Sequence, residues 1–532
     1  MRGALTHRRA PVLATALAAA AYLVWAPATA DMAGHTYRAW LFTHEGLTVW
    51  NAQWYGGHHV LGYSLVFAPL GVWPGPSWAG ALSAVAAVAL LTPLAYRGAP
   101  GRPAAATAAN WLFALGVLSN LLIGRMPFVL GIALAVAAWS ALERHGRAWA
   151  ATAAALALAG VLASPVAGAF LLLAGAARVL ARRSALRRAA LLAVPVIAGG
   201  GALALLFPEG GDDRFVASAF WPMLAVSVAG VLLLAPGRRA WWAAGLLTVA
   251  TLAASFAVPN TFGQNALRLP VLLGPVALLL APRREGIGGS RLLRGVVVAA
   301  LVYLAWLPAV RAVREANDDP STQASFWTAP REFLAKAARP GERVEVAFTR
   351  NHWEAAYLAS EVPLARGWER QLDEKANPVF YDGRRLTPAI YHRWLRGNAV
   401  RWVALPSAPL DYSAQAEARL VRRGLPYLKL ADHPPGWRIY EVRDTEPPAS
   451  GGARMLAAGP DGFEVEASGP TVVRQRFTRY WRATGGCVSR APHDWTRVAP
   501  TQPGPVVVRA QFALSEPEPR GCGAALTSSD GT

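Results

Sequence analysis

Three ionisable side chains follow the first apolar segment of the chain at helical spacing. Asp31, His35 and Arg38 stand at positions i, i+4 and i+7, so a helix through this stretch would project all three from one face. At the mouth of a membrane segment, an acid and a base could meet a polar head group without full loss of solvent. The alternative is an interfacial helix whose polar side faces water.

The next stretch, "WNAQWYGGHHVLGY" (50–63), combines aromatic rings with polar groups. We interpret it as a flexible loop in which Trp54, Tyr55 and His58 could contact a sugar, although an aromatic belt at a membrane interface uses the same residue types. His58 and His59 are adjacent and would point apart on a regular element, which disfavours a two-histidine metal site.

Further polar residues lie at the ends of other apolar segments. Arg125 stands between two of them, and Asn265 and Arg268 stand at the start of another. An arginine can clamp phosphate in bidentate fashion, but it can also snorkel to lipid phosphate. Asp212 and Asp213 occupy a glycine-rich loop, and we expect both to be solvated.

The composition indicates the elements that must position these residues. Of 532 residues, 54% are hydrophobic and 16% are charged, whereas soluble domains carry about 25% charged residues. Many windows exceed the roughly 18 apolar residues typical of a transmembrane helix. The net charge of +20 could indicate nucleic-acid binding, but the arginines cluster between apolar segments and form no basic stripe with stacking aromatics. We therefore expect a multi-span α-helical membrane domain and no nucleic-acid partner.

Eleven apolar segments are predicted to span the bilayer. The first is similar to a secretion signal, but the spans that follow favour an uncleaved helix, with cleavage before Asp31 as the alternative. The second is too long for one helix, and Pro74 and Pro76 predict a break ahead of a span that begins near Ser77. The segments are approximately 10–30, 62–96, 104–123, 126–142, 148–163, 165–181, 189–207, 216–235, 240–258, 266–281 and 294–309.

The arginine clusters predict the topology. With a cytoplasmic N-terminus, every cluster falls in an inner loop, while the outer loops are short and poor in basic residues. An odd number of spans then places the C-terminal region outside the plasma membrane. The chain has two cysteines, Cys487 and Cys522, and both fall in this region, where a disulfide between them is the simplest prediction.

The chain divides into four predicted regions. Residues 1–309 form the transmembrane domain with a long first outer loop (31–61), 310–445 an extracytoplasmic α/β domain, 455–516 a β-rich sandwich, and 517–532 a disordered tail. In the α/β domain, 343–348 and 400–406 read as strands, 413–424 as a helix and 427–442 as a hairpin. An unusually polar and aromatic stretch of this domain offers possible acceptor contacts, with a surface loop as the alternative: His352, Trp353, Trp368, Glu369 and Arg370.

The layout resembles the GT-C superfamily of integral-membrane glycosyltransferases. These proteins have a first span that ends at an outer Asp, a long first loop, many further spans and an outer C-terminal domain. Residues 31–71 are similar to the start of bacterial membrane proteins named six-pyruvoyl-tetrahydropterin-synthase-related, and "RFTRYWRATGGC" (476–487) is similar to the closing domain of YfhO-like proteins.

This resemblance implies transfer of a sugar from a polyprenyl-phosphate-linked donor to a glycan, lipid or protein acceptor of the bacterial cell envelope, on the extracytoplasmic side. The family's first-loop aspartate falls on Asp31, which would act as general base with His35 and Arg38 beside it. Arg125 and Arg268 would hold the lipid phosphate, and Arg38 and Asn265 are further candidates for this binding site. Many members carry two neighbouring acids in this loop, whereas Met32 follows Asp31 here. We therefore predict no cofactor, because the sequence does not support a divalent metal.

Two other functions stay open. A non-catalytic membrane assembly protein on the same scaffold is consistent with the single acid of the first loop. A transporter or flippase of a lipid-linked sugar would be expected to show repeat symmetry or ionisable residues in mid-span, and the sequence shows neither clearly.

Overall fold

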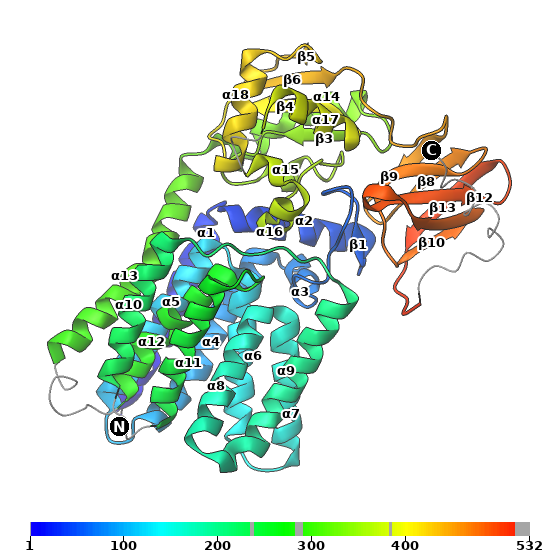
Figure 1. Ribbon diagram of the computed structural model, residues 1–532. Coiled ribbons are helices and arrows are strands. Elements are labelled where there is room, and N and C mark those ends of the chain that lie inside the picture. Colours follow the sequence, from blue (N-terminus) through cyan, green and yellow to red (C-terminus); the bar gives the residue numbers. More distant parts are fainter. Residues whose placement is uncertain (1, 235–238, 282–290, 382–385, 516–532) are drawn as a thin grey trace. The chain divides into compact units, whose positions relative to one another are not determined.

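The computed structural model describes residues 2–234, 239–281, 291–381 and 386–515 (Figure 1). It divides into two compact units. The helical unit contains residues 1–32 and 63–314, and the mixed unit contains residues 33–62 and 315–532. Residues 33–62, which the sequence places in the first outer loop, therefore fold with the mixed unit.

Long helices running side by side make up the helical unit (Figure 1). Proline stands at the first turn of α4, α5, α6 and α8, where its fixed φ suits the start of a helix. The predicted break near Pro74 and Pro76 is confirmed, since α3 ends at Val72 and α4 begins at Pro76. The helices are α1 (Arg2–Trp25), the start of α2 (Ala30–Glu45), α3 (Phe67–Val72), α4 (Pro76–Gly98), α5 (Pro103–Ile123), α6 (Met126–Leu142), α7 (Arg147–Ala163), α8 (Pro165–Ala181), α9 (Leu186–Leu206), α10 (Ala217–Leu233), α11 (Arg239–Ala257), α12 (Arg268–Leu280) and α13 (Arg291–Asn317).

The apolar helices support a multi-pass membrane protein. Among the described residues, six helices are long and apolar enough to cross a membrane, and a seventh crossing results if α1 and α2, which meet at a 77° bend, form one broken span. The helices α6, α7, α8 and α10 are apolar but shorter. All eleven predicted segments thus lie on helices, while the number of crossings stays a prediction.

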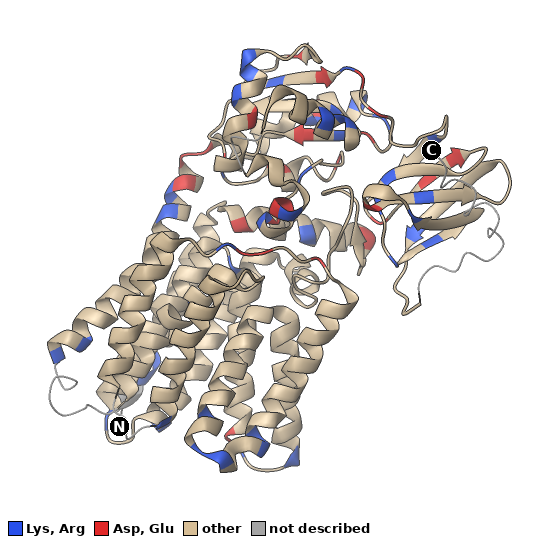
Figure 2. Ribbon diagram, viewed as in Figure 1, with Lys and Arg blue, Asp and Glu red and all other residues tan. Residues whose placement is uncertain are grey.

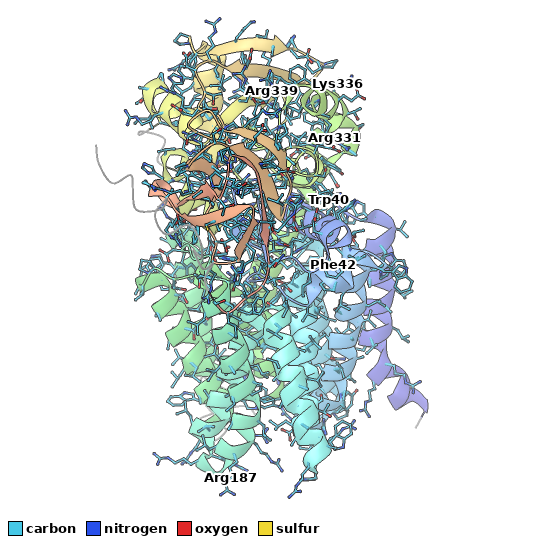
Figure 3. The ribbon with its side chains drawn as sticks, turned by 90° about the vertical axis from the view of Figure 1, so that its right-hand side faces the viewer. Trp40, Phe42, Arg187, Arg331, Lys336 and Arg339 are labelled. Carbon is cyan, nitrogen blue, oxygen red and sulfur yellow. The ribbon has the colours of Figure 1, made fainter. Side chains whose placement is uncertain are left out.

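Basic residues gather at one end of the helical unit. Figure 2 shows the Lys and Arg colour at the helix ends nearest the N-terminus. Arg187, near the start of α9, is exposed and projects from that end in Figure 3. This grouping is what the predicted inner loops require, and the orientation in the membrane stays a prediction.

An α/β sheet forms the first part of the mixed unit. Its strand order is β3 (Arg343–Val346), β4 (Val400–Pro406), β6 (Trp437–Val442), β5 (Leu428–Asp432), with β3 and β4 parallel and the other pairs antiparallel. The predicted strands, helix and hairpin are confirmed, and the helix ends at Gly424, whose φ of +83° suits a helix stop. Helices α14 (Thr328–Ala337), α15 (Glu354–Tyr357), α16 (Arg370–Ala376), α17 (Pro388–Gly397) and α18 (Gln415–Arg423) complete this part.

Two antiparallel sheets follow, as the alternating pattern predicts. One has the order β10 (Trp481–Thr484), β13 (Gly504–Ala510), β8 (Gly462–Ala467), β7 (Arg454–Ala458). The other has the order β11 (Gly486–Arg490), β12 (Trp495–Pro500), β9 (Thr471–Arg476). Buried residues alternate along β8 and β9. The predicted tail and Cys522 lie outside the described residues, so the disulfide stays a prediction.

The aromatic stretch at 50–63 is not a flexible loop. It contains a hairpin of β1 (Trp50–Asn51) and β2 (His58–His59), with Gly56 and Gly57 at positive φ in the turn. Backbone hydrogen bonds tie it into the mixed unit: Leu364 N donates to Gln53 O at 2.8 Å, and Arg476 N donates to Gly56 O at 2.7 Å. The expectation of an open loop was wrong because these long-range contacts close it.

Candidate functional site

The start of α2 is fixed against the turn between α5 and α6. Thr29 Oγ1 donates a hydrogen bond to the carbonyl of Ile123 at 2.8 Å. Gly124 follows at φ +97°, and a Cβ added there would lie 2.9 Å from Thr29 Oγ1 and 3.1 Å from the Cβ of Asp31. The close approach requires glycine at this position, and it places Asp31 beside the turn.

Both predicted phosphate-binding arginines lie near Asp31. Arg125 follows Gly124 directly, and Arg268 is the first residue of α12. Each of the two guanidinium groups interacts electrostatically with Asp31 and with Tyr63. Arg125 Nη1 donates to Asn120 Oδ1 at 3.3 Å, and the Arg268 guanidinium lies 5.0 Å from the ring centre of Phe128. The helical unit thus joins three residues that stand far apart in the sequence.

Asp213 also belongs to this cluster, although the sequence analysis expected its side chain to be solvated. Asn265 Nδ2 donates to its Oδ2 at 3.0 Å. Burial raises the pKa of Asp213 to about 6, and Arg268 and Arg125 oppose that rise. The expectation of a solvated side chain was therefore wrong for Asp213, whereas Asp212 is exposed as expected. Asn265, a candidate for binding the lipid phosphate, thus contacts this carboxylate through its side-chain amide, and its role toward a phosphate stays a prediction.

An apolar cavity adjoins the arginine cluster within the helical unit. It has a volume of about 180 Å³, and its walls come from α8, α10, α11, α12 and α13. Leu269 and Pro270, the residues after Arg268, line it, and so does Phe170. Phe170 packs edge-to-face on Phe128 with ring centres 5.9 Å apart. The cavity wall and Arg268 are therefore linked through Phe128, which contacts both Phe170 and the Arg268 guanidinium.

His35 and Arg38 are buried in the mixed unit rather than exposed on an interfacial helix. Their exposed fractions are 1% and 5%. Arg38 Nη2 donates to Glu369 Oε1 at 2.5 Å, and its guanidinium lies 5.0 Å from the ring centre of Trp368. The ring of His35 lies 6.0 Å from that of Trp368. The reading of a helix with its polar side in water was wrong for these two residues.

The predicted sugar contacts of the hairpin are buried too. Trp54 is fully buried and stacks on His58 at 5.3 Å between ring centres. Tyr55 is 4% exposed, and its hydroxyl donates to the carbonyl of Glu369 at 2.9 Å. His58 Nδ1 lies 4.0 Å from Glu369 Oε1. Trp54, Tyr55 and His58 therefore support the residues around Glu369 and present no open aromatic face in this structure.

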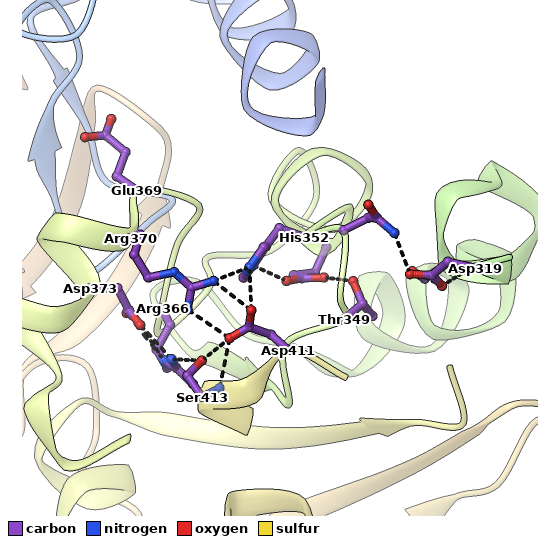
Figure 4. A network of polar contacts seen from close by, with 12 residues as sticks. Asp319, Thr349, His352, Arg366, Glu369, Arg370, Asp373, Asp411 and Ser413 are labelled. Atoms are coloured by element: carbon purple, nitrogen blue, oxygen red, sulfur yellow. Dashed lines mark hydrogen bonds and ion pairs between the residues drawn. The ribbon is translucent and has the colours of Figure 1, made fainter. Parts of the chain in front are cut away.

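His352 and Arg370 meet in a polar network at the carboxyl ends of β3 and β4 (Figure 4). Arg370 donates to both oxygens of Asp411, at 2.8 and 2.7 Å, and its Nη2 lies 3.1 Å from His352 Nε2. His352 Nδ1 lies 3.2 Å from Glu354 Oε1. Burial lowers the pKa of His352, but the two carboxylates outweigh it and raise the pKa overall. Both predicted acceptor contacts are thus occupied by protein partners.

Next to this network, the buried guanidinium of Arg366 lies near three buried carboxylates. Arg366 Nη2 donates to Asp373 Oδ2 at 2.6 Å, and its Nη1 lies 3.6 Å from Glu345 and 3.8 Å from Glu417. Burial raises the pKa of Glu345 and that of Glu417. A single positive charge cannot balance three buried negative ones, and this imbalance adds to the rise in the pKa of Glu345. Its burial in the core indicates a structural role.

A divalent metal in a protein is held by several carboxylate, histidine or cysteine side chains that lie close together. Within residues 2–234, 239–281, 291–381 and 386–515, no group of three or more His, Cys, Asp or Glu side chains could hold one. The two acids near Arg125 and Arg268 face cations instead. No chemical step is therefore routed through a metal.

Helices and sites together define a multi-pass membrane protein with a polar cluster in its helical unit. No family model matches the chain, and no curated protein does either. Two kinds of solved structure are similar. The cryo-EM structure of the arabinofuranosyltransferase AftD from mycobacteria matches 86% of this chain at 16% identity and a TM-score of 0.44, and the chain spans 41% of its length. The crystal structure of ArnT from Cupriavidus metallidurans bound to undecaprenyl phosphate matches 82% of this chain and 98% of its own, at 14% identity and a TM-score of 0.38.

Proposed function

We propose that the protein is an integral-membrane glycosyltransferase. It transfers a sugar from a polyprenyl-phosphate-linked donor to a cell-envelope acceptor on the extracytoplasmic side. One observation carries the proposal: Asp31, Arg125 and Arg268, from three separate helix ends, interact in one polar cluster of the helical unit. A carboxylate and two arginines are the groups that transfer from a lipid phosphate requires.

Each group has a distinct role in the proposed reaction. The Asp31 carboxylate accepts the proton of an acceptor hydroxyl, whose oxygen forms a bond to the anomeric carbon of the donor sugar. The bond between that carbon and the phosphate oxygen breaks, and the electron pair leaves with the lipid phosphate. Arg125 and Arg268 stabilise the charge that develops on this phosphate. The phosphate is a good leaving group, so positioning and these charges supply most of the catalysis.

The apolar cavity supports a lipid-linked donor. Leu269 and Pro270, directly after Arg268, are among its lining residues, and the described lining residues are almost all apolar. A polyprenyl chain with its phosphate at Arg268 could extend into it, because burial of isoprenoid methylenes needs no polar partner. A soluble nucleotide-sugar donor would have no use for such a cavity.

The test replaces Asp31 by Asn in a strain that lacks the native gene, with envelope glycans as the readout. Loss of the base is expected to reduce transfer by at least about 10²-fold at unchanged protein level. Asp212→Asn, an exposed neighbour of the cluster residue Asp213, is the matched control and should restore normal glycans. Restoration by Asp31→Asn would show that this residue is not the base and would favour an assembly role.

A second readout separates transfer from transport. In the deletion strain, a transferase leaves unused lipid-linked donor on the outer face of the membrane. A flippase would leave the donor on the cytoplasmic face. The orientation of the accumulated donor, measured by its accessibility to an impermeant sugar-oxidising reagent on intact cells, therefore distinguishes the two.

A further inference from the structure

Glu369 is a carboxylate with one oxygen held and the other open. The next residue, Arg370, donates to both oxygens of Asp411, which follows β4, so Glu369 lies near the sheet edge at which β3 and β4 end. Figure 4 shows its side chain pointing away from the network around Arg370 and Asp411. Residues at the carboxyl ends of parallel strands are commonly placed to meet a ligand.

The contacts of Glu369 fix its orientation. Arg38 Nη2 donates to Oε1 at 2.5 Å, and His58 Nδ1 lies 4.0 Å from the same oxygen. Its other oxygen, Oε2, accepts no hydrogen bond from the described residues, and the side chain is 16% exposed. A buried arginine thus holds the carboxylate while one acceptor atom stays accessible.

An aromatic ring stands beside this carboxylate. Trp368 is half-buried, and a Cβ added at Gly34 would lie 2.6 Å from its ring, so α2 packs closely against one side of the indole. The Arg38 guanidinium also lies near the indole. The ring is therefore held by α2 and by the Arg38 guanidinium, which also binds Glu369, the next residue of the chain.

We propose that Glu369 and Trp368 form a carbohydrate-binding site of the mixed unit and take a neutral sugar of the acceptor. A fixed carboxylate oxygen accepts sugar hydroxyls in charge-assisted hydrogen bonds, and an indole packs on the apolar face of a sugar ring. An anionic sugar would be repelled by the carboxylate. The assignment of this sugar to the acceptor rests on the proposed function, but the binding site itself does not.

Saturation-transfer difference NMR tests the site on the full chain in lipid nanodiscs. The probes are the methyl glycosides of neutral pentofuranoses and hexopyranoses, with methyl glucuronide as the anionic comparison. At least one neutral glycoside should receive saturation from wild-type protein, and Glu369→Gln should weaken its binding by about tenfold or more. Glu361→Gln, which removes an exposed carboxylate paired with Arg331, is the matched control and should bind like wild type.

Further variants make the outcome decisive. Trp368→Phe retains an aromatic face and should bind more weakly than wild type but better than Trp368→Ala. Circular dichroism confirms the fold of each variant. Unchanged glycoside binding by a folded Glu369→Gln variant would overturn the inference. So would the absence of NMR saturation transfer from the wild-type protein to any neutral glycoside.

The same experiment separates this site from the proposed reaction. Asp31→Asn should abolish transfer but leave glycoside binding unchanged, because Asp31 belongs to the helical unit. Normal transfer by Asp31→Asn would refute the proposed function and leave the binding site standing. Normal glycoside binding by Glu369→Gln would refute the site and leave the proposed function standing.

Discussion

Replacement of Asp213 by Asn should stabilise the helical unit at neutral pH. Burial raises the pKa of Asp213 from 3.8 to about 6 against the attraction of Arg268 and Arg125. A rise of this size corresponds to at most about 3 kcal/mol, and solvent screening of the partly exposed side chain reduces this to about 1–2 kcal/mol. Asparagine keeps the shape and carries no charge, so it avoids this cost.

The pH dependence of this stabilisation follows from proton binding to Asp213. Between about pH 4 and pH 6, the folded protein holds the Asp213 proton and the unfolded chain has lost it. Stability of the wild type therefore falls as pH rises through this window and levels off above it. Asp213→Asn removes this fall, so the difference between the two proteins is small near pH 4 and reaches its full size above about pH 6.5.

Thermal unfolding in detergent micelles between pH 4 and pH 7.5 measures this difference. Asp212→Asn is the matched control, because Asp212 is the neighbouring residue and is exposed. It should follow the wild-type curve at every pH. A stabilisation by Asp213→Asn that does not change with pH, or an equal effect of Asp212→Asn, would refute the burial of an ionisable carboxylate in the cluster.

Three further changes test other parts of the structure. Gly124→Ala should lower both stability and transfer because its Cβ would collide with the start of α2, whereas Gly146→Ala, at φ +108° in open space, should show only the backbone cost of about 1 kcal/mol in thermal unfolding. Arg366→Met should destabilise the mixed unit by about 3–5 kcal/mol by leaving buried carboxylates without a cation, while Arg396→Met, at an exposed ion pair, should cost less than about 1 kcal/mol in the same assay. Glu345→Gln should reduce the loss of stability with rising pH. Burial raises the pKa of the Glu345 carboxyl, so its ionisation in the folded protein, at pH values above the unfolded pKa near 4.3, is unfavourable. A steeper loss of stability in pH-dependent unfolding would contradict this reasoning.

The sequence predicts the helices of this chain well because their signal is local. Long apolar runs must be helical in a bilayer to satisfy their backbone groups, and all eleven predicted segments lie on helices. The number of crossings does not follow in the same way. Helix α6, with 17 residues, is short for a span on its own, and whether such a helix crosses depends on its neighbours and on the bilayer.

The aromatic hairpin shows where local reasoning fails. Trp54 and His58 have the composition of an open sugar-binding loop, and nothing in residues 50–63 reveals that Leu364 and Arg476 hydrogen-bond to that stretch. Gly367, which packs on Trp54, lies more than 300 residues further along the chain, so no local pattern encodes this contact. The same long-range packing leaves Glu369 partly exposed, and a sequence reading gives this residue no advantage over its neighbours.

The polar cluster of the helical unit lies between these two cases. Charged residues near a membrane are costly, so the sequence alone marks Asp31, Arg125 and Arg268 as candidate functional residues, and that assignment stays a prediction. Their proximity depends on glycines whose role is visible only in the fold: Gly124 admits the start of α2, and Gly263, at φ +40°, admits the backbone of Asp213, with which any Cβ would collide. A glycine-rich loop with two acids is normally solvated, so the burial of Asp213 could be inferred only from the close approach at Gly263. Residue types therefore suggest which side chains are candidates for a site, whereas the fold decides which of these side chains lie close together.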